Sequence, residues 1–471
     1  MPSWFILVPF ACILILNLAP KTWMSRFAFW LAAALACAQL ILAAGNQAIL
    51  QGVVDPLAKF FNFSLAIDGL SRLMLISIAI VVFAALLAGR YTIATAAKRF
   101  NFTNLVLIAL IGMNAVVMST DIFSLYVFVE TSAISLFILI AANKDKSALE
   151  GAFKYFILSA IATVFILFSI ALFVLLSGGT SFSLIRAALA GQGGAFLARL
   201  AMLLFLCGIF IKSGLVPFHG WLPDAYSSAA TPVSILLAGI VTKVTGAYVL
   251  MRLVTQVFVL DARTQNLLMF VGALSIIVGA YGALGQREFK RMLAYSSISQ
   301  VGYIVLALGC GTPLAFAGAA FHLFNHAIFK SLLFVNACCI EKETGTLDIE
   351  KMSGLSQRMP VTAASSLVAS LSTAGLPPLA GFWSKFIIIL ALMQAGKNTY
   401  AITALLASAL TLGYFLILQR KVFFSKPGEG VSGVKEAGTG LVLLELSLTL
   451  VTIGVGIAFP WVYNYLILPI L

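Results

Sequence analysis

Charged residues are scarce in this chain of 471 residues. They make up 10% of the sequence, whereas hydrophobic residues make up 62%, and the mean hydropathy is +1.08. A soluble globular domain carries about 25% charged residues. The composition therefore excludes that class and predicts a membrane protein with many spans.

Acidic residues and paired cysteines are scarce as well. The 29 basic against 16 acidic residues give a net charge of +13. In a soluble protein this excess would suggest nucleic acid, but here it lies in short loops between apolar segments, so membrane topology explains it and we expect no nucleic-acid partner. The 6 cysteines lie within apolar segments without a CxxC spacing. This is not the pattern of a disulfide framework or a metal cluster.

The first apolar segment, residues 4–18, lacks the flanks of a signal peptide. No basic region precedes it, and no small-residue cleavage site stands between Ala19 and Met24. We therefore expect it to be retained as the first span.

Apolar stretches long enough to cross a bilayer recur along the whole chain. A span needs about 20 apolar residues, so the sequence predicts an all-α integral membrane fold with about 14 transmembrane helices. Three predicted helices are long and contain Gly, Pro, His or Lys, which indicates broken or kinked helices; they are 196–225, 313–340 and 361–395. The others are 3–19, 27–44, 65–89, 103–119, 121–142, 152–177, 229–251, 265–284, 291–310, 399–419 and 440–468.

Basic residues are distributed unevenly between the two sets of loops. Loops after even-numbered helices carry few of them: Lys59, Arg186, Arg199, Arg252, Arg263 and Lys397. Loops after odd-numbered helices carry Lys21, Arg26, Arg90, Lys98, Arg99, Lys144, Lys146, Lys154, Arg287, Lys290, Arg291, Lys342, Lys351, Arg358, Arg420, Lys421, Lys426 and Lys435. By the positive-inside rule, both termini of this multi-pass protein face the outside, which for a cell inner membrane is the periplasm.

A lysine and a break in the backbone coincide in the segment 211–225, IKSGLVPFHGWLPDA. Lys212 lies in the middle of an apolar segment, and Gly214 and Pro217 break the segment directly afterwards. A lysine at mid-depth costs about 2.5–3.5 kcal/mol, and freed backbone groups need a partner. The coincidence of the two costs indicates a functional role.

A second break of the same kind follows 161 residues later. Residues 214–221, GLVPFHGW, align with residues 375–382, GLPPLAGF. The two breaks lie five predicted helices apart along the chain, and this odd offset places the copies in opposite orientations across the membrane. This pattern is typical of an inverted-topology repeat with discontinuous helices, here the seventh and the twelfth.

Further ionisable residues lie deep within predicted helices. Glu130, Lys243 and, after the second break, Lys385 are far from the ends of theirs. His322, His326 and Lys330 recur every four residues and so share one helix face, with Asn325 beside them. With one acid among these groups, the lysines cannot all be neutralised by carboxylates. A row of groups that gain and lose protons predicts a path for protons.

Each of these residues also has a purely structural interpretation. Glu130 and Lys212 would serve as a buried ion pair that only supports the fold. His322 and His326 would ligate a metal or haem, although no third ligand stands at a suitable spacing. His219, beside the first break, would only satisfy freed backbone groups.

Four polar or aromatic residues near the helix ends are predicted to be structural. Asp68 and Arg72, four residues apart at the start of the third helix, are expected to form an ion pair. Trp221 and Asp224 are expected at the membrane interface.

Five segments of the chain resemble one known family. This family comprises the antiporter-like membrane subunits of respiratory complex I, of membrane-bound hydrogenases and formate hydrogenlyases, and of Mrp cation/proton antiporters. The resemblance spans most of residues 60–425, and KSGLVPFHGWLPDA is its most specific part. The matching segments are KSGLVPFHGWLPDAYSSAATPVS (212–234), GIVTKVTGAYVLMR (239–252), FKRMLAYSSISQVGY (289–303), HLFNHAIFKSLLF (322–334) and AGLPPLAGFWSKF (374–386).

The resemblance implies a division of the chain and roles for its buried residues. It implies N-terminal helices 1–3 in residues 1–102, five-helix repeats in 103–252 and 253–425 that are inverted relative to each other, and a last helix in 426–471. Glu130 and Lys212 correspond to the paired acid and lysine of the first half-channel, and Lys243 to the bridging lysine. His322, His326 and Lys330 correspond to the central relay, and Lys385 to the lysine that faces the exit. Asp68 and His219 are secondary candidates.

The implied function is a proton-translocating subunit of a membrane redox complex of the NADH:quinone oxidoreductase or membrane-bound hydrogenase type. Such a subunit has no catalysis and no cofactor of its own. Its expected partners are homologous antiporter-like subunits, redox subunits with iron–sulfur clusters, and the lipid bilayer. The alternative is a subunit of a Mrp-type sodium/proton antiporter. Two further alternatives are a haem-bearing membrane enzyme and a stand-alone solute transporter.

Overall fold

The computed structural model describes residues 2–18, 21–45, 64–191, 196–428 and 433–470. Lys59, which entered the topology argument, lies outside them. Within these ranges the chain is all-helical, and β pairing is limited to the isolated bridges Leu65–Ser119, Asp121–Ser181 and Glu288–Asp348.

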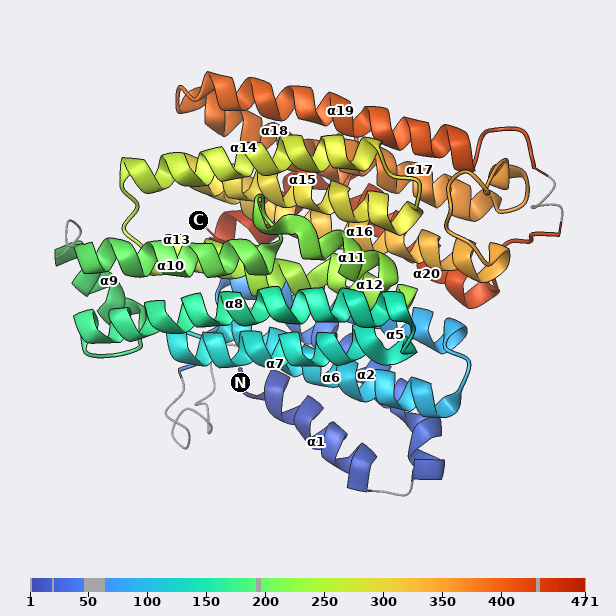
Figure 1. The fold of residues 1–471 in the computed structure, drawn as a ribbon, viewed down its shortest axis with the longest axis horizontal. Helices are drawn as coiled ribbons and strands as arrows, with labels where there is room; N and C mark the ends of the chain where they lie inside the picture. Colours follow the sequence, from blue (N-terminus) through green and yellow to red (C-terminus); the bar gives the residue numbers. More distant parts are fainter. Residues whose placement is uncertain (1, 19–20, 46–63, 192–195, 429–432, 471) are drawn as a thin grey trace.

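The helices follow one another along the chain as Figure 1 shows. They are α1 (Trp4–Leu18), α2 (Lys21–Ala44), α5 (Gly69–Thr92), α6 (Ala96–Met118), α7 (Ile122–Ile140), α8 (Lys146–Ser177), α9 (Phe182–Gly191), α10 (Phe196–Ser213), α11 (Trp221–Ser228), α12 (Thr231–Leu236), α13 (Val249–Gln256), α14 (Ala262–Leu284), α15 (Phe289–Cys310), α16 (Pro313–Thr344), α17 (Pro360–Ala374), α18 (Ala380–Gln394), α19 (Asn398–Val422), α20 (Thr439–Ile457) and α21 (Phe459–Val462). Leu237–Val241 and Lys243–Tyr248, between α12 and α13, are π-helical.

The prediction of an all-helical protein with many spans is confirmed. Over the described ranges, 12 helical segments are long and apolar enough to cross a bilayer, and α1 and α18 are shorter apolar helices. The number of 14 spans stays a prediction.

Two elements differ from the sequence-based expectation. The short helix α9 was not predicted, because its ten residues are too few for a span. The predicted helix 440–468 instead ends as α20 at Ile457, and a new helix starts around Pro460. Proline at this position lacks the N–H that would continue the α20 hydrogen-bond ladder, but it fits the first turn of a new helix.

Aspartates begin several of the helices. Asp121, Asp145 and Asp261 each accept a hydrogen bond from the backbone N–H three residues later, at 2.7, 2.7 and 2.8 Å. These bonds satisfy donors that the first turn of a helix leaves free. The hydrogen bond from Ala148 also lowers the pKa of Asp145.

Two segments form the centre of the bundle. The most apolar windows of Thr231–Gln256 and Pro313–Thr344 are 100% buried, whereas those of α2 and α8 are 33% buried. Figure 1 shows α15 and α16 in the middle, with α19 at one side and α1 at the other. The outer helices therefore present apolar faces to the surroundings, and the two enclosed segments carry Lys243, His322, His326 and Lys330.

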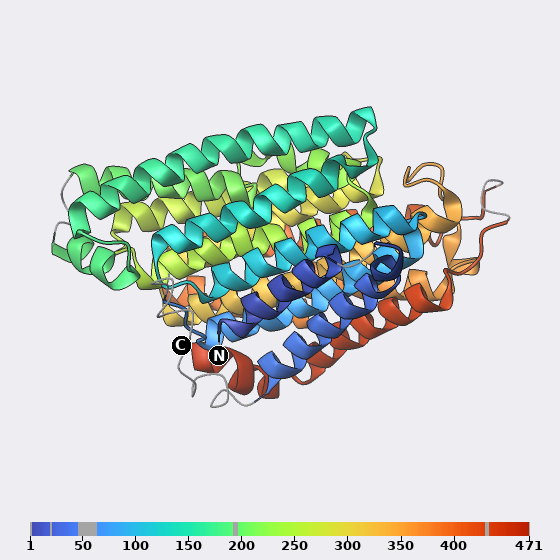
Figure 2. The same cartoon turned by 90° about the horizontal axis from the view of Figure 1, so that it is seen from below.

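The bundle has two ends that differ in their connections. Figures 1 and 2 show the described chain starting and finishing toward the end that also holds α9. The segments 345–359, 423–428 and 433–438 project from the opposite end. We call this opposite end, with Lys342, Arg358 and Lys435, the basic end.

Candidate functional site

Glu130 and Lys212 form an ion pair between α7 and α10. The Nζ of Lys212 lies 2.7 Å from Oε1 of Glu130 and donates a second hydrogen bond of 2.7 Å to Ser159. Thr163 donates a further hydrogen bond of 2.8 Å to the same carboxylate oxygen. The Lys212 side chain is 1% exposed and that of Glu130 is 20% exposed. The carboxylate is thus the member of the pair that the surroundings can reach.

The helix that carries Lys212 ends one residue later. Gly214 has a φ of +66°, a conformation that glycine adopts without steric cost. The N–H of Leu215 then bonds back to the carbonyl of Phe210 at 3.0 Å. These contacts place the ammonium group of Lys212 at the interruption between α10 and α11.

Trp221 closes the break from the other side. Its Nε1–H donates a hydrogen bond of 3.0 Å to the carbonyl of Ile211, and its ring stacks on Tyr155 with centroids 4.5 Å apart. Trp221 is buried, so its ring faces the protein rather than lipid, and its place at the depth of the interface stays a prediction. The cause of its burial is the free carbonyl at the helix end, which needs a donor inside the protein. Asp224 is paired with Lys154 and Arg291 near the basic end.

Lys243 lies in the π-helical stretch at the centre of the bundle. It is fully buried, and its Nζ donates to the carbonyl of Ala238. A Cβ added at Gly246, in the same stretch, would clash with Oγ of Ser213. The stretch therefore packs directly against the residue that follows Lys212, although no hydrogen bond joins the two lysines among the described residues.

His322, His326 and Lys330 line one face of α16. The two imidazole rings are nearly parallel, at 9°, with centroids 6.1 Å apart. Lys330 donates to the carbonyl of Leu293 at 3.1 Å and to Ser296. His326 makes no hydrogen bond among the described residues through either ring nitrogen, and it lies within electrostatic range of Lys243 and Lys330.

Lys385 lies beyond the second break, next to the histidines. Nδ1 of His322 is 2.9 Å from Oγ of Ser384, the neighbour of Lys385. The Nζ of Lys385 is 4.6 Å from the ring centroid of Tyr303 and 3.4 Å from the carbonyl of Ala374. The structure therefore brings Lys385 to the His322 end of the α16 face. We call Lys243, Lys330, His326, His322 and Lys385 the central row.

The two breaks share their backbone hydrogen bonds. The bond from Leu215 to Phe210 matches one from Leu376 to Leu371, at 3.0 and 3.1 Å. In addition, Gly214 bonds to Ile211 as Gly375 bonds to Ser372, and Phe218 bonds to Leu215 as Leu379 bonds to Leu376. Gly375, like Gly214, has a positive φ, of +90°. The predicted discontinuities are thus present and have the same local geometry.

Carboxylates are absent from the central row. Within the described part of the chain, Lys243, Lys330 and Lys385 form no salt bridge, and each donates instead to a backbone carbonyl. Carbonyls and hydroxyls accept hydrogen bonds from an ammonium or an amine alike. The row can therefore hold protons in varying number without breaking an ion pair.

The two secondary candidates lie away from the row. His219 is half-buried beside Tyr295, with ring centroids 6.4 Å apart, and its Nδ1 has no partner among the described residues. Asp68 pairs with Arg252, and the predicted pair with Arg72 is wrong. Arg72 points to the end of α2, where its Nε donates to the carbonyl of Ala43 at 2.8 Å. The last carbonyl groups of α2 have no partner within their own helix, so the Arg72 guanidinium donates to them instead of to the Asp68 carboxylate.

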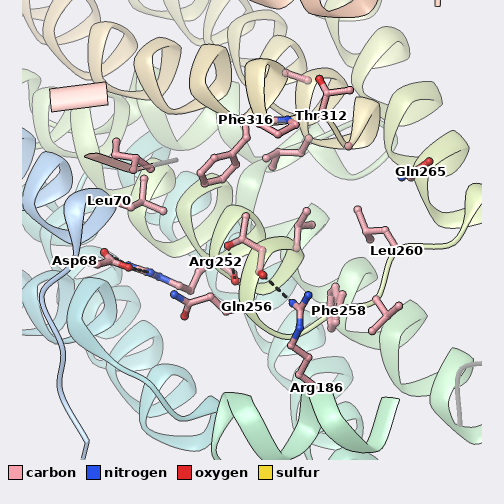
Figure 3. A pocket seen from close by; sticks show the side chains of 18 residues that line it. Asp68, Leu70, Arg186, Arg252, Gln256, Phe258, Leu260, Gln265, Thr312 and Phe316 are labelled. Atoms are coloured by element: carbon pink, nitrogen blue, oxygen red, sulfur yellow. Dashed lines mark hydrogen bonds and ion pairs between the residues drawn. The ribbon is translucent and has the colours of Figure 1, made fainter. Parts of the chain in front are cut away.

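Asp68 and Arg252 lie at one edge of an open pocket of about 530 Å³ (Figure 3). Arg186 donates a hydrogen bond of 2.8 Å across this pocket to the carbonyl of Thr255. Burial raises the pKa of Asp68, but the hydrogen bond and charge of Arg252 and the bonds from Ser71 outweigh this and lower it to about 2. Asp68 is therefore a fixed negative charge rather than a group that exchanges protons near neutral pH.

One buried acid was missed in the sequence. Glu445 on α20 is 0% exposed and accepts a hydrogen bond of 2.7 Å from Asn336 on α16. It stands in the apolar run LVLLELSLTL, and an acid within such a run was the available signal. Its position near the start of the predicted helix 440–468 concealed its depth.

The described residues contain no group of three or more His, Cys, Asp or Glu side chains placed to hold a metal ion. His322 and His326 stack on one another on a single helix, with Ser384 rather than a third ligand beside them.

Comparison with known proteins gives consistent results. The profile of the family described as NADH:quinone oxidoreductase/Mrp antiporter, TM, matches residues 119–411. NADH-quinone oxidoreductase subunit N of Desulforudis audaxviator is 32% identical, over 93% of this chain and 90% of that protein. A Na⁺/H⁺ antiporter subunit of Alkalihalophilus pseudofirmus is 31% identical, over 86% and 82%.

A solved structure extends the likeness to the fold. A chain of the Mrp complex from Dietzia sp. superposes with a TM-score of 0.90 at 23% identity, covering 99% of this chain and 96% of that one. The arrangement of helices is therefore shared over nearly the whole chain.

Proposed function

Because this chain belongs to the NADH:quinone oxidoreductase/Mrp antiporter transmembrane family, we propose that it is a proton-translocating, non-catalytic subunit of a membrane redox complex related to respiratory complex I. The observation that carries the proposal is the ion pair of Glu130 and Lys212 at a helix break, next to a row of lysines and histidines without carboxylates. Ionisable groups so deep in membrane helices mark proton pathways.

The proposed mechanism is electrostatic. When Glu130 lies against Lys212, its charge holds a proton on the lysine, and when it moves away, burial favours release of that proton. The proton then passes to Lys243 and along Lys330, His326 and His322 to Lys385. The partly exposed Glu130 is the member that a neighbouring subunit would move, so the energy comes from the redox reaction of partner subunits.

The alternative is a subunit of a Mrp-type sodium/proton antiporter. The similarity to a Na⁺/H⁺ antiporter protein and the superposition on a Mrp complex support it. The same buried residues would serve both functions. Sodium dependence of the proton flux would favour the antiporter, and dependence on an electron donor would favour the redox complex.

We further propose the assembly and the topology that the family implies. Residues 103–252 and 253–425 form the two inverted repeats, supported by the matched hydrogen bonds of the two breaks. The basic end faces the cytoplasm of a bacterial inner membrane, and both termini face outward. Homologous antiporter-like subunits and iron–sulfur redox subunits are the partners, and the chain itself carries no redox cofactor.

The replacement Lys212→Met tests the proposed function. Methionine keeps an unbranched apolar stem in the buried position but removes the ammonium group. In vesicles that contain the assembled complex, we expect proton translocation to fall at least about tenfold. The complex should still assemble and, if it contains redox subunits, should still transfer electrons.

The matched control is Lys154→Met. Lys154 also lies 2.7 Å from two carboxylates, but its side chain is 43% exposed in the third turn of α8. The complex with Lys154→Met should translocate protons at the normal rate. Unchanged translocation in Lys212→Met would refute the assignment of Lys212.

A further inference from the structure

Glu445 lies in a buried polar cluster that the proposed relay does not use. The cluster joins α20 to α16 and α17, near the basic end. Asn336 donates one hydrogen bond of 2.7 Å to Glu445 and another of 2.6 Å to Ser365. The Cys339 thiol also contacts the carboxyl group. None of the described cations forms a salt bridge with Glu445, although its side chain is fully buried.

The hydroxyl of Thr362 stands between two carboxyl groups. Its Oγ1 lies 3.0 Å from Oε2 of Glu445 and 2.8 Å from Oε1 of Glu436. A hydroxyl group has one proton and can donate to only one of these oxygens. The other contact is a hydrogen bond only if that carboxyl group donates to the hydroxyl oxygen. One of the two acids therefore holds a proton.

The surroundings of the two acids place that proton on Glu445. The second oxygen of Glu436 accepts the N–H of Val361 at 2.7 Å, in the first turn of α17, where the helix dipole favours a negative charge. Glu436 is also half-exposed. Glu445 is 0% exposed and none of the described cations forms a salt bridge with it, and a carboxyl group buried without an ionic partner favours its neutral form.

We propose that Glu436, Thr362 and Glu445 form a proton port between the basic end of the molecule and its interior. From the state in the structure, Glu445 gives its proton to Oγ1 of Thr362 while the original hydroxyl proton moves to Oε1 of the ionised Glu436. The reverse step returns a proton that Glu436 has taken from water. One O–H bond forms and one breaks at Oγ1 of Thr362, so the hydroxyl is regenerated and charge is conserved.

The port ends against α16, the helix that also carries His322, His326 and Lys330 of the central row. Asn336, which holds Glu445, lies on α16 six residues after Lys330, about 9 Å along the helix axis. The proposal rests on the proposed function for the destination of the proton. The exchange between Glu436 and Glu445 stands on the local geometry alone.

The experiment is infrared spectroscopy of the purified protein together with translocation assays in vesicles. A protonated buried carboxyl group gives its own C=O stretching band, and this band shifts when the proton exchanges with deuterium. We expect Glu445→Gln to abolish the band and to lower translocation at least about tenfold. The glutamine keeps the size of the side chain and the acceptor for Asn336, so folding should persist.

Thr362 supplies a matched pair of variants. Thr362→Val removes the hydroxyl at constant shape and should slow deuterium exchange of the band at least about tenfold, whereas Thr362→Ser should restore it. Glu350→Gln, at an exposed acid, should change neither reading. Persistence of the band in Glu445→Gln, or normal exchange in Thr362→Val, would overturn the port.

Lys212→Met separates the two proposals. It should stop translocation but leave the band and its exchange as in the unmodified protein. If Lys212→Met translocates normally while the band behaves as expected, the proposed function fails and the port stands.

Discussion

Buried lysines are accommodated in two different ways in this molecule. Lys212 has a carboxylate partner, whereas Lys243, Lys330 and Lys385 have carbonyl or hydroxyl partners. An ammonium group that faces a carboxylate stays charged, and one that faces neutral oxygens is free to lose its proton when its neighbours are charged. At the residue scale, the ion pair therefore distinguishes Lys212, whose proton Glu130 is proposed to control, from the three lysines of the proposed proton path.

Asp68 gives a prediction about stability and pH. Its pKa is lowered from 3.8 to about 2, so its contribution is fully present above about pH 4 and is lost as the pH falls through about 2. The lowering corresponds to about 2 kcal/mol, and because the side chain is 45% exposed we expect about 1 kcal/mol. Asp68→Asn should lower the melting temperature of the detergent-solubilised protein at pH 7, and the difference should vanish near pH 2.

Asp261→Asn is the control for this prediction. Asp261 begins α14 as Asp68 begins α5, but it forms no salt bridge among the described residues. Asparagine retains helix capping at both sites. An equal loss of stability in both variants would contradict the role of Arg252.

The positions of site residues could be predicted from the sequence where a short-range pattern or a family motif specified them. The i, i+4 spacing placed His322, His326 and Lys330 on one face, and the family resemblance paired Glu130 with Lys212. The contact between Asp68 and Arg252 joins residues 184 positions apart, which no local pattern reveals. Glu445 lies near the start of its helix, and its burial depends on how α16 and α17 pack around it.

At the scale of the element, the breaks position the lysines. Gly375 has a φ of +90°, and a Cβ added there would lie 3.0 Å from Cδ of Lys385. Gly375→Ala should therefore cost about 1–2 kcal/mol in backbone strain and also displace the side chain of Lys385. We expect translocation in vesicles to fall several-fold.

Gly396 is the matched control for Gly375. It has a φ of +71°, but nothing lies within 4 Å of an added Cβ. Gly396→Ala should lose similar stability by thermal unfolding and keep its translocation rate. A parallel loss of translocation in both variants would show that strain, rather than the position of Lys385, is responsible.

Helices were predictable from apolar length and breaks from Gly and Pro. The discontinuities at Gly214 and Gly375 follow from residues whose backbone preferences are strong. The π-helical stretch around Lys243 could not be predicted, because its residues are compatible with an α-helix and only the surrounding helices impose the wider turn. The short helix α9 was not predicted because its ten residues are too few to span a membrane.

At the scale of the whole molecule, charge separates the two ends. Glu350 lies at the basic end and Arg263 at the other, and both are exposed. In a chain with Cys37→Ala, the exposed cysteine of the described residues is removed. A membrane-impermeant thiol reagent added to whole cells should then label Arg263→Cys but not Glu350→Cys, and lysis should expose Glu350→Cys. The reverse pattern would contradict the proposed orientation.

The class of the molecule was predictable from composition alone, because so apolar a chain has no other stable environment. Which helices are central was not, since α16 and α8 are equally long and both strongly apolar. What distinguishes them is polar content. Helix α16 carries the histidines and lysines that only an enclosed position tolerates, whereas α8 presents large apolar side chains outward.

The continuity of α16 has an electrical consequence. His322 and Lys330 are eight residues apart on one unbroken helix that crosses the membrane, so they differ in depth by about 12 Å of a hydrocarbon layer about 30 Å thick. A proton carried between them traverses about 0.4 of the membrane voltage, or about 0.9 kcal/mol per 100 mV. The membrane potential of the cell would thus oppose proton transfer between these two residues. Proton passage along α16 should slow measurably as the opposing voltage rises.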